Sequence, residues 1–161
     1  MHQSRVVFDY TIFNSLEELP EPDLLLMEAA IAARENAYAP YSGFRVGAAV
    51  LLENDEIVIG NNQENASYPS GLCAERVAVY QAGARFPGIA IRALAISAAS
   101  DRIKVDRPAA PCGNCRQAIA EYEQRQTRGV RIIMMGATGV GYICNSISDL
   151  LPFTFSRSNL E

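Results

Sequence analysis

Two short cysteine motifs, far apart in the sequence, constrain the fold more than any other feature. Cys73-Ala74-Glu75 and Pro111-Cys112-Gly113-Asn114-Cys115 each stand at the start of a helical pattern. A helix N-terminus stabilises a thiolate through its unpaired N–H groups and the positive end of its dipole. Three thiolates can bind one Zn²⁺ and leave a tetrahedral position open for water. The fold that this predicts brings two helix N-termini together at one cation.

The cysteine spacing by itself leaves other interpretations open. Cys112 and Cys115 share one helix face, but such a pair also occurs as a redox pair, as a structural zinc knuckle or by chance. The upstream Cys73 favours zinc, and the single histidine, His2, lies in an N-terminal stretch that is poorly placed to complete a mixed site. We interpret Cys144 as a small buried hydrophobe, although as a fourth thiolate it would close the site.

Glu75 follows Cys73 in the first turn of the same predicted helix. An exposed helical glutamate is usually a solvated charge, but a carboxylate beside a metal can carry protons to and from its water. Three thiolates would make zinc a weak Lewis acid unless a cation offsets their charge. Arg76 and Arg116 are the arginines that we expect to do this.

Composition narrows the class of protein and of partner. The 161 residues fit one domain, 1–161, and 49% hydrophobic with 20% charged residues predicts a globular fold. No apolar run reaches the roughly 20 residues that span a bilayer, and we find no signal peptide, so we expect a cytoplasmic protein with reduced thiols and no membrane partner. A net charge of −4 with scattered basic residues disfavours nucleic acid and favours a small uncharged substrate.

Hydrophobic periodicity predicts an α/β domain with three layers, in which helices cover both faces of a central mixed sheet of about five strands. Residues 1–20 form an added arm, within which 5–13 favour a strand or a pairing segment. The remaining predicted elements are a helix over 21–38, a hairpin over 44–61, a loop over 62–72, a helix over 73–84, a strand over 92–99, a helix over 112–124, strands over 130–135 and 139–145, and a capping box at 146–149 that opens a last short helix.

Four segments in order and spacing, 38–49, 62–68, 73–76 and 111–117, resemble the small free-nucleoside cytidine deaminases that have three cysteine ligands. The Cys-x-Glu and Pro-Cys-x-x-Cys pair is a known signature of zinc-dependent deaminases. The resemblance covers roughly 21–155 and leaves 1–20 outside. It implies Cys73, Cys112 and Cys115 as zinc ligands, Glu75 as the proton shuttle, and Arg76 as a hydrogen-bond donor to the ligand sulfurs.

The resemblance also implies the substrate contacts. Phe44 would pack against the base, whereas its alternative is an ordinary core position in a strand. Asn62 and Glu64 would hold the ribose hydroxyls. The backbone N–H of Ala74 would bind the base carbonyl, and the backbone C=O of Ala110 would accept from the amine.

Proteins similar to this chain form homotetramers, which implies that Ala66, Tyr68 and Phe155 act across a subunit interface; their alternative role is local packing. The implied reaction is zinc-dependent hydrolytic deamination of cytidine and 2′-deoxycytidine in pyrimidine salvage, with release of ammonia. Two positions depart from the family's pattern: Gln63 stands where Val or Ile is common, so that a polar side chain can enter the site, and Ala110 stands where Ser is frequent.

Two rival functions stay open. In the first, Cys144 completes a closed, non-enzymatic zinc module. In the second, the chain deaminates another aminopyrimidine, such as a nucleoside antibiotic or a base in a polynucleotide. Asn62 and Glu64 favour a free sugar, and the acidic surface disfavours a nucleic-acid strand.

Overall fold

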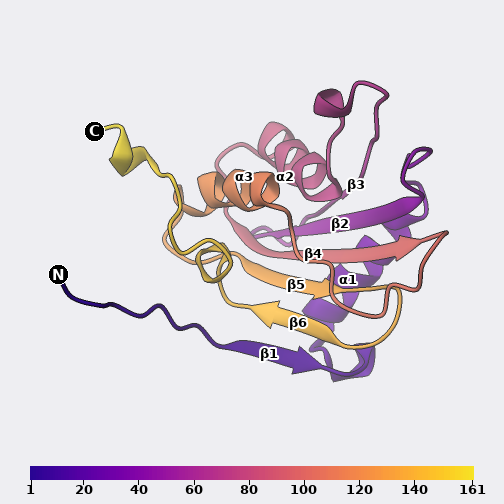
Figure 1. Ribbon diagram of the computed structural model, residues 1–161, viewed down its shortest axis with the longest axis horizontal. Coiled ribbons are helices and arrows are strands. Elements are labelled where there is room, and N and C mark those ends of the chain that lie inside the picture. The colour runs from indigo at the N-terminus through magenta and orange to yellow at the C-terminus, as the bar shows by residue number, and fades with distance from the viewer.

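The computed structural model describes all residues from 1 to 161 and contains one six-stranded sheet, with the strand order β1-β6-β5-β4-β2-β3 (Figure 1). Only β4 and β5 run parallel, so the sheet is mixed, as predicted. The strands are β1 (Tyr10–Phe13), β2 (Phe44–Leu52), β3 (Ile57–Asn61), β4 (Ile91–Ser100), β5 (Arg131–Met135) and β6 (Gly141–Cys144).

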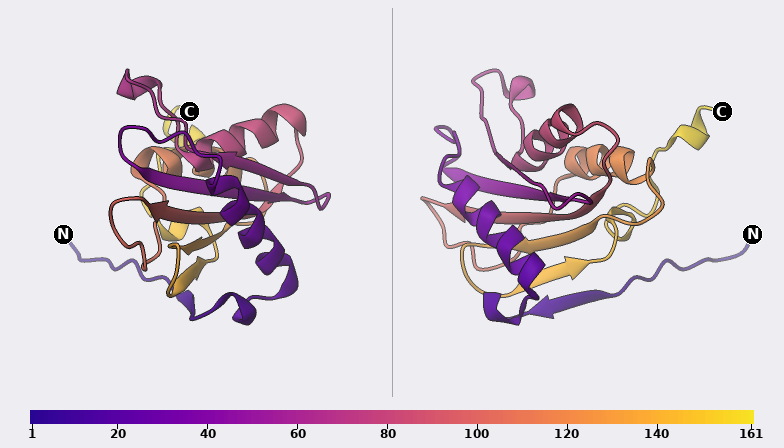
Figure 2. Two further views of the ribbon diagram at one scale, coloured as in Figure 1. Left: turned by 90° about the vertical axis from the view of Figure 1, so that its right-hand side faces the viewer. Right: turned by 180° about the vertical axis from the view of Figure 1, so that it is seen from behind.

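Three helices cover the two faces of the sheet and make three layers. The helix α1 (Glu21–Arg34) packs alone on one face, which Figure 2 shows from behind. The helices α2 (Ala74–Arg85) and α3 (Gly113–Glu123) lie side by side on the other face (Figure 1). Each face has its own buried cluster, because the central strands are apolar on both sides. The predicted three-layer α/β class is confirmed.

Two glycines in the hairpin of β2 and β3 let helices approach the sheet closely. A Cβ atom on Gly47 would lie 2.0 Å from the carbonyl oxygen of Ala30 in α1. A Cβ atom on Gly60 would lie 2.5 Å from the backbone nitrogen of Ala78 in α2. Both distances are far below van der Waals contact, so only glycine fits at these positions. The helix backbones therefore rest directly on the two faces of the hairpin.

The sheet has one strand more than the predicted five, because Tyr10–Phe13 joins its edge. This strand, β1, pairs antiparallel with β6, with Tyr10 opposite Cys144. Phe13 is buried with the residues of α1, which anchors the strand. Residues 1–9, which precede this strand in the chain, are exposed and extended.

The first long helix ends earlier than predicted. α1 stops at Arg34, whereas the apolar pattern continues to Tyr38. The backbone N–H of Tyr38 donates to Asn62 at 3.0 Å, and its carbonyl accepts from Glu64 at 2.9 Å. These bonds to a distant segment replace the helical ones, so tertiary contacts override the local pattern.

Candidate metal centre and substrate cavity

The two cysteine motifs meet where α2 and α3 begin. Cys73 is the N-cap residue of α2 and Cys112 that of α3, while Cys115 lies in the first turn of α3. The three sulfur atoms all lie within 4.8 Å of one another, and those of Cys112 and Cys115 are 3.4 Å apart. A tetrahedral zinc with thiolate bonds of about 2.3 Å needs sulfurs about 3.8 Å apart. The donor set and its spacing therefore fit one zinc ion.

Cys144 does not belong to this cluster. It is buried in β6, opposite Ile132 of β5, and burial raises the pKa of its thiol. The group of sulfurs that could share an ion comprises Cys73, Cys112 and Cys115 alone. The alternative of a closed site with Cys144 as a fourth thiolate is therefore wrong, and its interpretation as a small core residue is correct.

Glu75 places a carboxyl group in the same cavity as the thiols. Its side chain is almost fully buried, at 5% exposure, in the first turn of α2. Burial raises the pKa of Glu75, because desolvation disfavours the charged form, and the nearby Cys73 thiolate adds to the effect. A carboxyl group with a raised pKa in a cavity is suited to accepting and returning a proton.

The charge on the thiols is distributed by hydrogen bonds within the cluster. The Cys115 thiol, and after it Arg76, lower the pKa of Cys73 to about 5, while the bond to Cys73 raises the pKa of Cys115. Cys73 is therefore the more acidic thiol of this pair. The Nε atom of Arg76 is buried without a hydrogen-bond partner, which leaves it free to serve the sulfurs beside it.

Arg116 has a different role from the one expected. Its Nε donates to the carbonyl of Pro111 at 2.8 Å, and a second guanidinium nitrogen donates to the carbonyl of Leu150 at 2.7 Å. The side chain thus ties the loop that precedes Cys112 to the C-terminal segment. Arg116 positions a ligand loop, and of the two arginines only Arg76 lowers the pKa of a clustered thiol.

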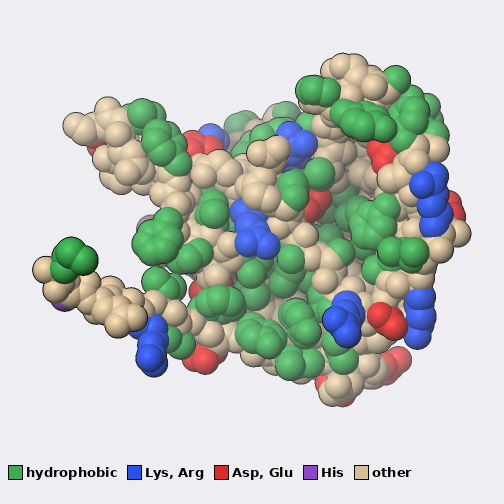
Figure 3. All heavy atoms as spheres, viewed as in Figure 1, with side chains coloured by type: hydrophobic (Ala, Val, Ile, Leu, Met, Phe, Trp, Pro, Cys, Tyr) green, Lys and Arg blue, Asp and Glu red, His purple; other side chains and the backbone are tan.

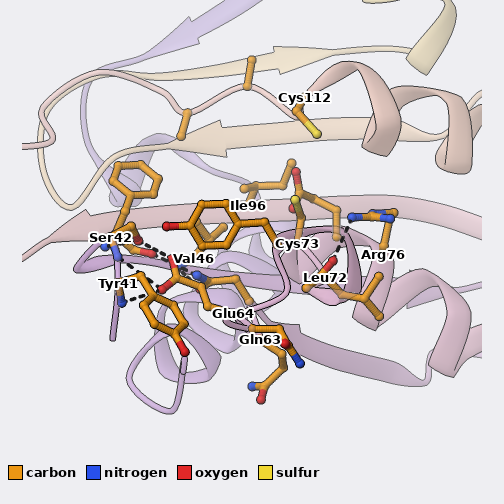
Figure 4. A pocket seen from close by; sticks show the side chains of 18 residues that line it. Tyr41, Ser42, Val46, Gln63, Glu64, Leu72, Cys73, Arg76, Ile96 and Cys112 are labelled. Carbon is orange, nitrogen blue, oxygen red and sulfur yellow. Dashed lines mark hydrogen bonds between the residues drawn. The ribbon is translucent and has the colours of Figure 1, made fainter. Parts of the chain in front are cut away.

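A cavity of about 600 Å³ opens beside the thiols (Figure 4). Its wall includes most of the residues expected at the site, namely Phe44, Asn62, Glu64, Tyr68, Cys73, Glu75, Arg76, Ala110 and Cys112. Ala74 is buried at the start of α2, whereas Ala66 and Phe155 lie outside the wall of this cavity. The structure thus brings residues of β2, the loop after β3, the start of α2 and the loop before α3 together around one space.

Glu64 is held by a turn whose role the sequence analysis missed. Its carboxylate accepts hydrogen bonds from the backbone N–H groups of Tyr41, at 2.9 Å, and Ser42, at 3.2 Å, and from the Ser42 hydroxyl (Figure 4). These bonds lower the pKa of Glu64, the Ser42 hydroxyl contributing most. The available signal was the turn-forming Tyr41-Ser42-Gly43 immediately before Phe44.

Asn62 fastens the start of β2. Its Oδ1 accepts from the N–H of Val46 at 2.8 Å, and its Nδ2 donates to the carbonyl of Phe44 at 3.0 Å. Gln63, by contrast, is exposed at the rim, and its amide donates to Asn61 at 2.5 Å. Gln63 is thus part of the cavity wall, as the sequence suggested, with its amide engaged by Asn61 of β3.

Comparison with known proteins gives the family. Residues 20–129 match the family model of the cytidine and deoxycytidylate deaminase zinc-binding region. The chain belongs to this deaminase family. The match contains all three clustered cysteines, and together with their geometry it confirms the predicted zinc cofactor.

Relatives of known name and structure cover most of this deaminase-family chain. It is 37% identical over 140 residues to a cytidine deaminase of Halalkalibacterium halodurans, across 85% of this chain and 96% of that protein. It is 41% identical over 138 residues to a probable cytidine deaminase of Dictyostelium discoideum, across 83% of this chain and 84% of that one. The crystal structure of a cytidine deaminase from Burkholderia pseudomallei matches with a TM-score of 0.71 and 40% identity, across 81% of this chain and 97% of its own.

Proposed function

We propose that this chain catalyses the zinc-dependent hydrolytic deamination of cytidine and 2′-deoxycytidine to uridine and 2′-deoxyuridine, with release of ammonia, as a step of pyrimidine salvage. One observation carries the proposal: the buried Glu75 carboxyl lines a cavity together with Cys73 and Cys112 of the three-thiol cluster. The family match and the named cytidine deaminases among its relatives support it.

Zinc held by Cys73, Cys112 and Cys115 would lower the pKa of water in the cavity and supply a Lewis acid. Glu75 accepts the proton that the attacking water loses, and it passes protons to N3 of the pyrimidine and then to the departing amine. The sum is one water consumed and one ammonia released, so Glu75 returns to its starting state. Arg76 holds the thiolate of Cys73 in its charged form.

The cavity wall offers a contact for each part of a nucleoside. Phe44 packs against the base, and the carbonyl of Ala110 accepts from the amine. The backbone N–H of Ala74 binds the base carbonyl from the start of α2, where such groups are unpaired. Asn62 and Glu64 take the ribose hydroxyls, and the turn at Tyr41 and Ser42 orients the Glu64 carboxylate.

A free nucleoside suits the site better than a polynucleotide. The volume of about 600 Å³ lies within the usual range of small-molecule pockets, roughly 300 to 1,000 Å³. The net charge of −4 would repel a phosphate backbone. Other aminopyrimidine nucleosides are the alternative substrates that the same contacts admit.

The deciding experiment follows ammonia release from zinc-loaded protein supplied with cytidine, 2′-deoxycytidine, cytosine or an oligodeoxynucleotide that contains cytosine. We expect turnover of both nucleosides and at least a hundredfold lower kcat/KM for cytosine, because cytosine lacks the sugar that Asn62 and Glu64 hold. Turnover of the oligonucleotide at a rate similar to that of the nucleosides would contradict the proposed substrate class.

Assembly and location belong to the same proposal. Tyr68 is 75% exposed and Phe155 58% exposed, which is more than aromatic side chains usually show, so we propose that they and Ala66 complete the pocket of a neighbouring subunit in a homotetramer. None of the helices is both long and apolar enough to cross a membrane. We keep the cytoplasmic location as part of this proposal. Sedimentation velocity tests the tetramer directly.

A further inference from the structure

Within the added N-terminal residues 1–20, the segment Arg5–Asp9 continues β1 beyond the end of the sheet. From here on, the word arm means these five residues alone. β1 is the edge strand, and it pairs on one side only, with β6. The arm projects away from the body of the molecule in Figures 1 and 3. No backbone hydrogen bond within the chain involves the arm. It is therefore a strand in sequence that lacks a partner in the single chain.

Side chains of the arm and of β1 alternate as they do in a strand with one covered face. Successive side chains of a strand point to opposite faces, so the even-numbered residues share one face. These are apolar and largely exposed: Val6, Phe8, Tyr10 and Ile12. Aromatic contacts already link Phe8 to Tyr10, with ring centroids 6.4 Å apart, and Tyr10 to Tyr142 of β6, at 5.1 Å. An exposed apolar strand edge of this kind is a site for pairing with another strand.

The arm is separate from the proposed catalytic machinery. The matched family region begins at residue 20, and no arm residue lines the cavity. Arg5 and Asp9 take part in none of the salt bridges within the chain. Deamination thus leaves both the apolar side chains and the two charges of the arm without a role.

The arm carries opposite charges at its two ends, which favours a second, antiparallel copy of the arm as its partner. Arg5-Val6-Val7-Phe8-Asp9 is complementary to itself when two copies run antiparallel with Val7 opposite Val7. In that register each Arg5 faces the Asp9 of the other copy, and each Val6 faces a Phe8. Opposite charges and apolar pairs are the cross-strand neighbours that stabilise antiparallel strands. We propose that the arm pairs with the arm of a second copy of this chain across a two-fold axis at Val7.

Symmetry makes this arrangement sterically simple. Antiparallel arms enter their sheets from opposite directions, so the two bodies lie at opposite ends of the paired segment. Pairing at the free edge of β1 joins the two sheets and continues the aromatic row of Phe8, Tyr10 and Tyr142 across the axis. The contact is isologous, because the same patch serves both copies, and it closes on itself as a dimer contact.

A disulfide at the axis tests the register. Directly opposed residues of antiparallel strands have Cα atoms about 4.5 to 5.5 Å apart, which a disulfide can bridge. We expect zinc-loaded Val7→Cys to form a covalent dimer under mild oxidation, whereas Thr11→Cys, also exposed and on the same face, stays monomeric on a denaturing gel. The unsubstituted protein gives the background from the native thiols. Equal crosslinking of the two variants, or none in Val7→Cys, would overturn the proposal.

Charge reversal then tests whether the Arg5–Asp9 pairs favour pairing between two arms. In the Val7→Cys background, Arg5→Asp sets Asp against Asp, and Asp9→Arg sets Arg against Arg. Each is expected to slow crosslinking at least about fivefold. The combination of both reversals restores complementarity and should restore the rate. Deaminase activity, which the arm does not touch, confirms that every variant is folded. If the combined variant crosslinks as slowly as the single variants, pairing with a second copy is wrong.

Discussion

Glu75 and Asp23 are the two carboxylates that the fold buries, and their surroundings separate a catalytic role from a structural one. Asp23 of α1 forms a salt bridge with Arg131 of β5, which satisfies its charge. Glu75 forms no salt bridge, and it faces the cavity beside Cys73 and Cys112. A buried carboxyl group without a paired cation is costly to stability, so its retention beside the thiols indicates a chemical use.

Replacing Glu75 by Gln should keep zinc and lose turnover, because the amide fills the same space but cannot carry a proton. General acid and base catalysis contributes about 10² to 10⁴ in rate, so kcat should fall by at least about a hundredfold. Metal analysis together with steady-state kinetics on cytidine checks both parts. Asp23→Asn is the contrasting control, since it should lower the melting temperature and leave kcat within about twofold. Wild-type turnover in Glu75→Gln would contradict the shuttle role.

Cys144 and Cys115 should differ sharply in their effect on metal content, although both are buried thiols. Cys144→Ala leaves the three-sulfur cluster intact, so the zinc content should be unchanged, and the cost is the loss of one packed atom, about 1 kcal/mol of unfolding free energy. Cys115→Ala removes a ligand and should lose most of the metal. Loss of zinc from Cys144→Ala, measured on the purified protein, would mean that a fourth thiolate participates after all.

Among the elements, the turn at Tyr41–Gly43 shows how a loop can orient a proposed substrate contact, the Glu64 carboxylate. It brings two N–H groups and one hydroxyl to Glu64, and Arg102 fastens it by donating to the carbonyl of Tyr41 at 2.8 Å. The turn thus determines where the carboxylate points. Its influence on the reaction should appear in substrate binding and not in the chemical step.

Ser42→Ala should raise KM for nucleosides about five- to tenfold and change kcat by less than about twofold, because one hydrogen bond to a charged group is lost. Steady-state kinetics with cytidine separates the two constants. Ser70→Ala is the matched control, since Ser70 is exposed and does not line the cavity. An equal KM for Ser42→Ala and the unsubstituted protein would show that the turn does not orient Glu64.

Local sequence patterns predicted most elements, and the exceptions have a common cause. The helices that carry Cys73 and Cys112, the hairpin, and the capping box at Ser146 lie where periodicity and cap chemistry place them. Two predictions failed because of partners distant in sequence. Tyr38 lies outside α1 because its backbone bonds to Asn62 and Glu64, and the Arg116 guanidinium donates to two backbone carbonyls. Such long-range contacts have no local signature. The clustered thiols were foreseeable because their chemistry demands convergence. The sequence also signals the turn at Tyr41–Gly43, but not the bond from Ser42 to the distant Glu64.

At the scale of the whole molecule, the core and the metal site are built from different residues. The two buried clusters flank the sheet and consist of apolar side chains, with Cys144 the only cysteine among them. The cluster of three thiols lies at one end of α2 and α3. The sheet and its helices therefore have a source of stability that does not depend on the metal.

Removing zinc with a chelator should accordingly lower stability without unfolding the protein. The far-UV circular dichroism spectrum should persist, and the melting temperature should fall by at least about 5 °C, because a ligand that binds the native state stabilises it and about 1 kcal/mol shifts the melting temperature by 2–4 °C in a domain of this size. Scanning calorimetry before and after chelation measures the shift. Collapse of the spectrum to that of an unfolded chain would mean that the metal organises the fold.

The position of α2 relative to the hairpin depends on residue 60 being a glycine. Because residue 60 has no side chain, the backbone of α2 packs directly on β3, and Cys73 and Glu75 at the start of α2 share a cavity with Asn62, which follows that strand. One added carbon at residue 60 would push α2 away from the sheet and move Cys73 and Glu75 away from the proposed sugar contacts. The distance between the thiols and the proposed sugar contacts is thus set by how closely two backbones approach each other at Gly60.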